Sequence, residues 1–379
     1  MPALSQMVVN LKKSGIRELM EMAGAMDGVI HLEVGEPLFA TPAHIILAAQ
    51  EAAQSGFTKY TPNNGLLSLR RLIAERVQGD YGLALTPEEI VVTVGGVGAI
   101  ATAVQALVDY GEEVLIPDPG WPNYESIVCC AGAVPRRYPL LPERGFLPTR
   151  ETLEQVITSK TKVIIINSPS NPLGVVMPAE LVQDLVDLAR RRDLYIVSDE
   201  VYDKIVFDGH HCSALSFDTD RRVIGVFSFS KTYAMTGWRV GYAVAPKAIA
   251  AQIAKLQEAY VSCACSVSQK AAEAALLSSQ DCVETMRRTY GDNLTAARVL
   301  LDRIGIDYQI PRGAFYIWID VKSRDSAAFA KNFLMSEKVA VAPGTTFGHS
   351  GRSYIRISLA SDRESIREGL LRLGSFKHE

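Results

Sequence analysis

Residues 163–200 read VIIINSPSNPLGVVMPAELVQDLVDLARRRDLYIVSDE. Two nearly continuous runs of apolar residues, 163–167 and 194–198, flank residues 178–192, whose apolar side chains recur at helical spacing. Such runs are typical of strands that are buried on both faces, and a proline such as Pro178 suits the first turn of a helix. The segment therefore predicts a strand–helix–strand unit of a mostly parallel sheet.

The same alternation extends over the middle of the chain, where further strands are expected at 90–94, 114–116, 223–227 and 240–244. We therefore predict an α/β fold with a large domain over residues 41–280, in which helices flank a mostly parallel central sheet. Residues 1–40 and 281–379 are expected to form a smaller α+β domain, because a long helical stretch at 281–304 gives way to short mixed segments. These segments are 314–321, 328–337, 339–342, 354–358 and a closing helix from residue 362.

The composition argues against several classes of protein. Of the 379 residues, 48% are hydrophobic and 21% are charged, which supplies a sizeable core and argues against disorder. Basic residues number 39 against 42 acidic ones, so the chain lacks the basic excess of a nucleic-acid-binding protein. The uncharged stretch 90–108 breaks at Gly95-Gly96, which predicts a strand, a turn and a buried helix in place of a membrane span.

The six cysteines include no C-x-x-C pair, and no nearby histidines complete a zinc set. We therefore expect free thiols and no metal site. The first thirteen residues lack the order of a basic head, an apolar centre and a small-residue cleavage site that a signal peptide has. These features predict a cytoplasmic protein with no membrane partner.

Polar residues follow four of the expected strands. They are Gly95-Gly96, Asn167-Ser168-Pro169, Asp199-Glu200 and residues 228–231, which read Ser-Phe-Ser-Lys. In open α/β sheets ligands bind at the carboxyl ends of the strands. We therefore expect these residues to form a polar rim around one binding site.

The chemistry of this rim matches one ligand. Lys231 follows a buried strand, where desolvation would lower the pKa of its amine and make it nucleophilic towards a carbonyl. Asp199 could hold a protonated ring nitrogen, and Tyr202 could donate a hydrogen bond to a ring oxygen. The glycine turn at 95–98, the serines before Lys231 and Arg239 would suit a phosphate. Pyridoxal 5′-phosphate carries a carbonyl, a basic ring nitrogen, a ring oxygen and a phosphate.

Ten motifs along nearly the whole chain extend this interpretation. They are Gly-Glu-Pro at 35–37, Tyr-Thr-Pro at 60–62, Gly-Gly at 95–96, Asp-Pro-Gly-Trp-Pro-Asn-Tyr at 118–124, Asn-Pro-Leu-Gly at 171–174, Asp-Glu-Val-Tyr at 199–202, Ser-Phe-Ser-Lys at 228–231, Gly-Trp-Arg-Val-Gly at 237–241, Pro-Arg-Gly-Ala-Phe-Tyr at 311–316 and Tyr-Ile-Arg-Ile-Ser at 354–358. With these motifs in this order, the chain resembles the class I/II aminotransferases, which are fold-type I pyridoxal-phosphate enzymes. It is most similar to their bacterial aspartate and aromatic branch.

The resemblance implies a role for individual residues. Lys231 would form the Schiff-base link to the cofactor and afterwards move a proton between substrate and cofactor. Asp199 would keep the ring nitrogen protonated, and Tyr202 would hydrogen-bond the ring oxygen. Trp121 would stack on the ring, and Asn171 would contact the same oxygen or the substrate carboxylate.

Further roles concern the two anionic groups. The phosphate would be bound by the amides at Gly96 and Val97 and by the side chains of Ser228, Ser230 and Arg239. Arg356 would clamp the α-carboxylate of the substrate, with help from the amide of Gly35. Tyr60 would reach the phosphate of the neighbouring subunit, which implies a homodimer with shared active sites.

The resemblance leaves the reaction and the substrate open. An aminotransferase that passes an amino group from an L-amino acid to a 2-oxo acid by a ping-pong mechanism is the leading hypothesis. The alternative is a carbon–sulfur β-lyase or related chemistry that starts from the same carbanion at the substrate Cα. A preference for dicarboxylates would need a second cation near the substrate side chain, for which Arg17, Lys12 and Lys13 are candidates. For residues 343–348 two interpretations have similar weight: a loop near the active site, or a surface turn.

Overall fold

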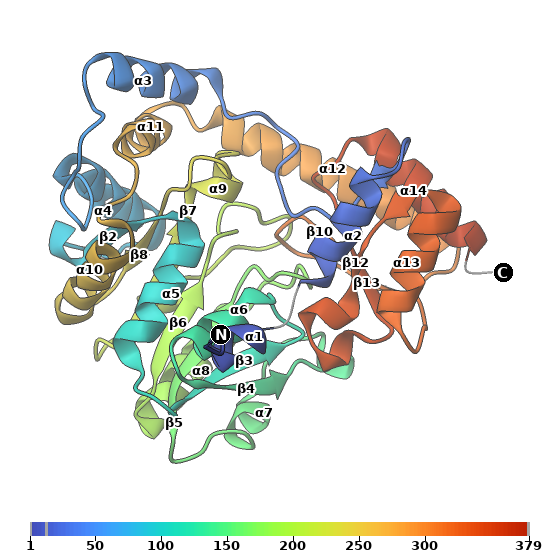
Figure 1. Ribbon diagram of the computed structural model, residues 1–379, viewed down its shortest axis with the longest axis horizontal. Helices are drawn as coiled ribbons and strands as arrows, with labels where there is room; N and C mark the ends of the chain where they lie inside the picture. Colours follow the sequence, from blue (N-terminus) through green and yellow to red (C-terminus); the bar gives the residue numbers. More distant parts are fainter. Residues whose placement is uncertain (1, 12–13, 377–379) are drawn as a thin grey trace.

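The computed structural model describes residues 2–11 and 14–376 and is built around a seven-stranded sheet (Figure 1). The strand order is β2-β8-β7-β6-β5-β3-β4. The strands are β2 (Ile90–Thr93), β3 (Glu113–Asp118), β4 (Val134–Pro139), β5 (Thr161–Asn167), β6 (Tyr195–Asp199), β7 (Val223–Ser228) and β8 (Gly241–Val244). Only β8 runs antiparallel to its neighbours β2 and β7. The predicted α/β fold with a mostly parallel central sheet is therefore confirmed.

Helices cover both faces of this sheet. They are α3 (Ala43–Gln54), α4 (Leu67–Tyr81), α5 (Gly95–Leu107), α6 (Asn123–Cys130), α7 (Arg150–Glu154), α8 (Ala179–Arg192), α9 (Phe229–Thr232), α10 (Lys247–Val261) and α11 (Ser266–Leu277). Side chains alternate along a strand, so Ile164 and Ile166 of β5 share a buried cluster with α4 and α8, whereas Val163 and Ile165 share one with α5, α6 and α10. Burial on both faces explains why the central strands are continuous apolar runs in the sequence.

Two features of the large sheet differ from the expectation. The edge strand β4 was not predicted, because it contains Pro135, Pro139 and two arginines, and prolines are tolerated at a sheet edge. The strand expected at 240–244 begins at Gly241 and is antiparallel. The helix expected over 178–192 also begins one residue later than predicted, because Pro178 precedes α8 and the helix itself begins at Ala179.

The remaining elements form a second, smaller group (right of Figure 1). Its antiparallel sheet has the order β12-β13-β10-β9, with β12 (Ala342–Pro343), β13 (Tyr354–Ser358), β10 (Tyr316–Asp320) and β9 (Tyr308–Gln309). The short segment expected at 339–342 is divided, since β11 (Val339–Ala340) pairs in parallel with β1 (Ile30–His31) and not with this sheet. The helices here are α2 (Gly15–Gly24), α12 (Asp281–Arg303), α13 (Ser326–Glu337) and α14 (Arg363–Phe376).

The pairing of β1 with β11 brings residues near the N-terminus beside the last hundred residues. The short helix α1 (Gln6–Val9) lies instead against α6 of the large sheet. The predicted domain boundaries near residues 40 and 280 stay a prediction. None of the helices in the described ranges combines the length and the apolar character that crossing a membrane requires.

Candidate active site

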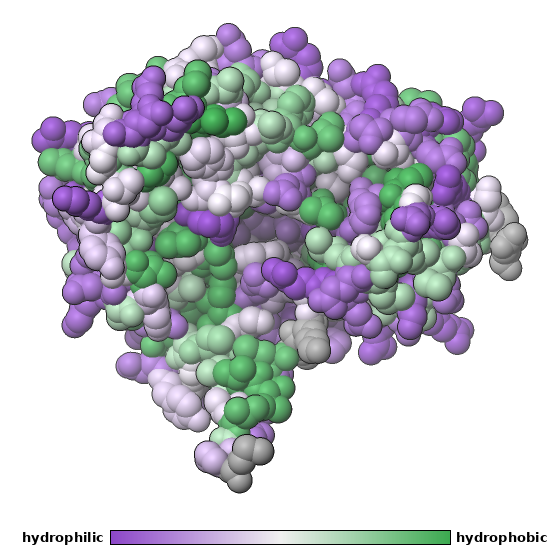
Figure 2. Space-filling model, turned by 45° about the horizontal axis from the view of Figure 1, so that its top comes forward, coloured by the Kyte–Doolittle hydropathy of each residue, from purple (hydrophilic) through white to green (hydrophobic). Residues whose placement is uncertain are grey.

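A cavity of about 530 Å³ lies where the carboxyl ends of the parallel strands face the smaller sheet. Asn167, Asp199 and Ser228, which end β5, β6 and β7, line one side, and Tyr316 and Arg356 of β10 and β13 line the other. Figure 2 shows a hollow near the middle of the face that it presents, with hydrophilic residues around it. The polar rim that the sequence predicts is therefore one continuous surface.

Lys231 lies on α9, the single helical turn directly after the buried strand β7. Its Nζ donates a 2.7 Å hydrogen bond to the carbonyl oxygen of Gly35. Burial lowers the pKa of Lys231 to about 8, although the Glu36 carboxylate favours the charged form. About a tenth of the amine is then neutral at pH 7, far more than for an ordinary lysine, and the neutral form is the one that attacks a carbonyl.

Asp199 ends β6 and is 4% exposed. Its Oδ2 accepts a 2.5 Å hydrogen bond from the hydroxyl of Tyr124 on α6, and its backbone carbonyl accepts one of 2.9 Å from Asn167 Nδ2. Burial raises the pKa of Asp199 to about 6, and the Tyr124 hydrogen bond opposes that rise. The carboxylate is therefore ionised at neutral pH and would bind a cationic N–H strongly.

Tyr202 is 3% exposed, and its hydroxyl lies 2.8 Å from the hydroxyl of Tyr316. Burial raises the pKa of Tyr202 well above its ordinary value, so the phenol stays protonated. The guanidinium of Arg356 stacks 4.2 Å from the centre of the Tyr316 ring. These contacts connect the large-sheet side of the cavity to the small-sheet side.

An anion-binding end is built at the start of α5. Gly95 has a φ of +70°, and a Cβ on it would lie 2.7 Å from Arg239 Nη2. A Cβ on Gly96 would lie 2.9 Å from Val201 Cγ1. A side chain at either position would force a neighbour or the turn to move, so the two glycines allow the helix N-terminus to lie close to Arg239, Ser228 and Ser230 on the cavity wall. Backbone N–H groups, two hydroxyls and a guanidinium together suit a phosphate.

Arg356 is 2% exposed and lies at the opposite end of the cavity. Its Nη1 donates a 2.8 Å hydrogen bond to Asn171 Oδ1, and its Nη2 donates one of 2.5 Å to the backbone carbonyl of Glu33. Its Nε has no hydrogen-bond partner among the described residues, and none of them forms an ion pair with it. A buried guanidinium whose hydrogen-bond partners are neutral is a strong donor site for a carboxylate.

Most of the predicted site residues line this cavity. They are Gly35, Gly96, Val97, Trp121, Asn171, Asp199, Tyr202, Ser228, Ser230, Lys231, Arg239 and Arg356. Tyr60 does not line it and is 87% exposed. Of the three candidate cations, Arg17 lines the cavity, and Lys12 and Lys13 lie outside the described residues.

Several lining or supporting residues were not predicted. Tyr124 stands three residues after Trp121 and their rings meet edge to face, so its place in the same motif was the signal for its position near the ring site. Tyr316 ends the Pro-Arg-Gly-Ala-Phe-Tyr motif at 311–316, and the sequence assigns it no role of its own. Phe347, 4.9 Å from the Arg356 guanidinium, brings the loop 343–348 to the cavity, so the site alternative is confirmed for this loop.

The residues present fit pyridoxal phosphate. One cavity holds a buried amine of lowered pKa, a buried carboxylate, a buried phenol and a helix N-terminus beside an arginine. The glycines at 95 and 96 leave the space at the helix N-terminus clear of side chains. No group of three or more His, Cys, Asp or Glu suited to a metal occurs in the described ranges.

The fold is that of the aminotransferases. The model of the aminotransferase class I and II family matches residues 27–373, and the chain belongs to this family, which uses pyridoxal phosphate. It is a transferase of nitrogenous groups.

Relatives cover the full length of the chain. A putative aminotransferase of Bacillus subtilis is 37% identical over 99% of this chain and 98% of its own length. An aspartate aminotransferase of Pyrococcus horikoshii is 36% identical over 98% of this chain and 96% of its own. The solved aspartate aminotransferase of Thermus thermophilus with maleate has a TM-score of 0.95 at 35% identity, over 99% of this chain and 100% of that one.

Proposed function

We propose that this aminotransferase uses pyridoxal phosphate, held in the cavity described above, to move an amino group from an L-amino acid to a 2-oxo acid. The observation that carries the proposal is the placement of Lys231, Asp199 and Arg356 on one cavity. A nucleophilic amine, a carboxylate for a ring nitrogen and a cation for a substrate carboxylate are the three groups that the reaction needs. The bound cofactor supplies an electron sink for the carbanion formed at the substrate Cα.

The catalytic residues are Lys231, Asp199 and Tyr202. Lys231 would hold the cofactor at its carbonyl carbon through the neutral amine, and the same amine would carry a proton to and from the substrate Cα. Asp199 holds the proton on the ring nitrogen, because its carboxylate is ionised at neutral pH. Tyr202 donates to the ring oxygen, and Trp121 lies on the cavity wall where it can cover a ring face.

The cofactor and the substrate bind at opposite ends. Ser228, Ser230, Arg239 and the amides at Gly96 and Val97 hold the phosphate. Arg356 binds the α-carboxylate of each substrate in turn, oriented by its hydrogen bond to Asn171. The amine donor and the oxo acid share this carboxylate, so one arginine serves both halves of the ping-pong cycle.

The active enzyme is proposed to be a homodimer. Tyr60 lies outside the cavity of its own chain and is 87% exposed, so its side chain is accessible to a second copy. This exposure is explained if Tyr60 enters the site of a second copy and binds the phosphate there. The cavity is then completed only by the partner.

The first experiment is a half-reaction. Purified protein carrying the cofactor is mixed with each common L-amino acid in the absence of an oxo acid. We expect the visible absorption of the aldehyde form of the cofactor to fall and that of the aminated form to rise in stoichiometric amounts. A 2-oxo acid should reverse both changes. Release of pyruvate and ammonia from a cysteine conjugate, with no amino acid converting the cofactor, would instead establish the β-lyase.

A dicarboxylic donor is proposed as the preferred substrate. Arg17 on α2 lines the cavity, and its side chain forms no ion pair with any described residue. It is therefore available for the distal carboxylate of aspartate or glutamate. Several relatives, among them the one from Pyrococcus horikoshii, are named aspartate aminotransferases.

We predict that Arg17→Gln raises KM for aspartate about ten-fold and leaves KM for alanine or phenylalanine unchanged, since only a dicarboxylate loses an ion pair. Arg71→Gln, at an exposed arginine of α4 away from the cavity, is the matched control. Equal changes for all donors, or none for any, would reject Arg17 as the determinant of substrate preference.

A further inference from the structure

A second buried carboxylate lies directly beside Asp199. Glu200 is fully buried, and its Oε1 accepts hydrogen bonds from Ser198 Oγ at 2.8 Å, Ser213 Oγ at 3.1 Å and the backbone N–H of Ala214 at 3.1 Å. It does not line the cavity. Successive side chains of an extended chain point to opposite sides, so Asp199 faces the cavity and Glu200 faces away from it.

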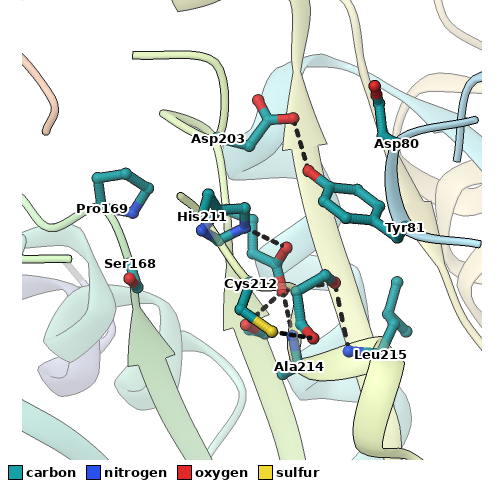
Figure 3. Close-up of polar contacts among 12 residues, drawn as sticks. Asp80, Tyr81, Ser168, Pro169, Asp203, His211, Cys212, Ala214 and Leu215 are labelled. Atoms are coloured by element: carbon teal, nitrogen blue, oxygen red, sulfur yellow. Dashed lines mark hydrogen bonds and ion pairs between the residues drawn. The ribbon is translucent and has the colours of Figure 1, made fainter. Parts of the chain in front are cut away.

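The other oxygen of Glu200 is bound by His211. His211 Nε2 lies 2.8 Å from Glu200 Oε2, and the histidine side chain is 4% exposed. His211 and Ala214, which are both labelled in Figure 3, each hydrogen-bond one oxygen of this carboxylate. The His211 ring makes an edge contact with Tyr81, whose hydroxyl donates a 2.9 Å hydrogen bond to Asp203 Oδ2 (Figure 3).

The charge balance favours an ion pair. Burial is the largest influence and lowers the pKa of His211, but the charge and the hydrogen bond of Glu200 act together with Asp203 against it, and the net effect is a raised pKa. Asp203 adds to this effect and Lys204 opposes it. A buried carboxylate without such partners would carry a large desolvation penalty, so these contacts fix where Glu200 can lie.

The backbone of Glu200 is fixed as well. Its N–H donates a 2.9 Å hydrogen bond to the carbonyl of Val226 in β7, and its carbonyl accepts one of 3.0 Å from the N–H of Asp203. Asp199, directly before Glu200, and Tyr202, two residues after it, both lie on the cavity wall. The turn 199–203 is therefore anchored from behind by Glu200.

We propose that Glu200 and His211 are positioning residues, a buried pair that holds the turn 199–203 so that Asp199 and Tyr202 meet the pyridoxal phosphate ring in the correct orientation. The inference rests on the proposed function, because it assumes that the cofactor binds in this cavity. Neither residue touches the cofactor, so their effect passes through the backbone between them and the two cavity residues.

The test measures cofactor binding to the apoprotein, not turnover. Glu200→Gln keeps the size of the side chain and removes its charge, and His211→Phe keeps a ring against Tyr81 and removes the hydrogen bond. Each apoprotein is titrated with pyridoxal phosphate, and the visible circular dichroism per bound cofactor is recorded. We expect affinity about ten-fold weaker for each variant, with a reduced dichroism that reports a misplaced ring.

The matched control is Glu113→Gln. Glu113 is 6% exposed and accepts hydrogen bonds from Thr158 Oγ1 at 2.6 Å and Thr161 Oγ1 at 3.3 Å. It lies at the beginning of β3, at the end of the sheet away from the cavity. If Glu113→Gln and Glu200→Gln lower the thermal stability of the apoprotein equally and both keep normal affinity and dichroism, the positioning role is overturned.

The double variant tests whether the residues act as a pair. Glu200→Gln/His211→Phe should weaken binding no more than either single change, because one interaction is lost in all three proteins. Losses that multiply would overturn the pairing. Should the single variants not fold, Ser213→Ala removes one donor to Glu200 and should shift the dichroism in the same direction by less. A wild-type apoprotein that does not bind the cofactor would overturn the proposed function itself.

Discussion

Burial acts on Lys231 and Asp199 in opposite directions. Removing a charged group from water disfavours its charged form, so the pKa of the amine falls to about 8 and that of the carboxyl rises to about 6. The shift of Lys231 makes the amine available as a nucleophile. The shift of Asp199 is limited by the Tyr124 hydrogen bond, which keeps the carboxylate ionised at neutral pH.

We predict that Lys231→Met raises the Tm of the apoprotein, and by more at pH 7 than at pH 10. The pKa of Lys231 is lowered from 10.5 to about 8 on folding, so between these values the unfolded chain binds more protons and stability rises with pH. The unfavourable burial of the charged amine is thus largest below pH 8. Thermal denaturation at the two pH values measures it.

Lys255→Met, at an exposed lysine of α10, serves as the control and should give the same small change at both pH values. A gain for Lys231→Met that does not depend on pH would contradict the lowered pKa.

We predict that Tyr124→Phe raises the pH below which the apoprotein loses affinity for pyridoxal phosphate. The hydrogen bond from Tyr124 favours the ionised form of Asp199, so its removal raises the pKa of that carboxyl above about 6. A protonated Asp199 cannot pair with a protonated ring nitrogen. Titrations of apoprotein between pH 5 and pH 8 (a window of roughly one to two units about that pKa) measure the midpoint.

Protonation of the cofactor's own groups also changes the affinity with pH. This effect is the same for variant and wild type, so the difference between their midpoints reports Asp199 alone. Tyr138→Phe is the control, because Tyr138 is equally buried and its hydroxyl donates to the carbonyl of Ile165 away from the cavity. Identical midpoints for wild type and Tyr124→Phe would refute a role of this hydrogen bond.

At the scale of elements, the ends of β5, β6 and β7 bring their last residues together because neighbouring parallel strands end at the same edge. The first turn of α5 completes this edge with its N-terminus. Close packing of Gly95 against Arg239 and of Gly96 against Val201 fixes how near this helix approaches the strand ends. The anion site is thus made by the packing of elements as much as by its side chains.

We predict that Gly95→Ala weakens the affinity of the apoprotein for pyridoxal phosphate by about ten-fold or more. The new Cβ would lie 2.7 Å from Arg239 Nη2 at a φ of +70°, so either the turn or the guanidinium must move. Gly98→Ala on the same helix is the control, since its Cβ would meet Val94 at an ordinary 3.6 Å. Equal affinities for the two variants would show that the close approach is not needed.

At the scale of the whole molecule, the cavity joins parts of the chain that are far apart in sequence. Lys231 donates to Gly35, and Arg356 donates to Asn171 and to Glu33. Motion of the small sheet relative to the large one would change all of these contacts together. Tyr60, which is exposed, would add to the cavity a contact from a second copy of the chain.

We predict that mixing two inactive variants restores activity. Lys231→Ala lacks the amine and Tyr60→Ala lacks the residue given to the partner, but a mixed dimer has one site with both. After unfolding and refolding together in equal amounts, about a quarter of the sites should be intact. Turnover of the mixture against that of each variant alone measures this, and no recovery in mixed dimers would refute shared sites.

The sequence by itself determined the α/β class and most of the cavity wall. Strands such as β5 and β7 are continuous apolar runs because they are buried on both faces, and local pattern reports burial directly. The glycines, Lys231 and Asp199 follow such strands, so their common location could be inferred from the rule for sheet edges.

Only the tertiary structure decided the direction of β8, the edge strand β4 and the division of residues 339–342 between two sheets. Which strand pairs with which depends on contacts between distant segments, and local periodicity carries no record of them. The same holds for Tyr124 on Asp199 and His211 on Glu200, which meet across 75 and 11 residues of sequence. Residue types could be read along the chain, but the partner of each buried polar group was set by the packing of the whole chain.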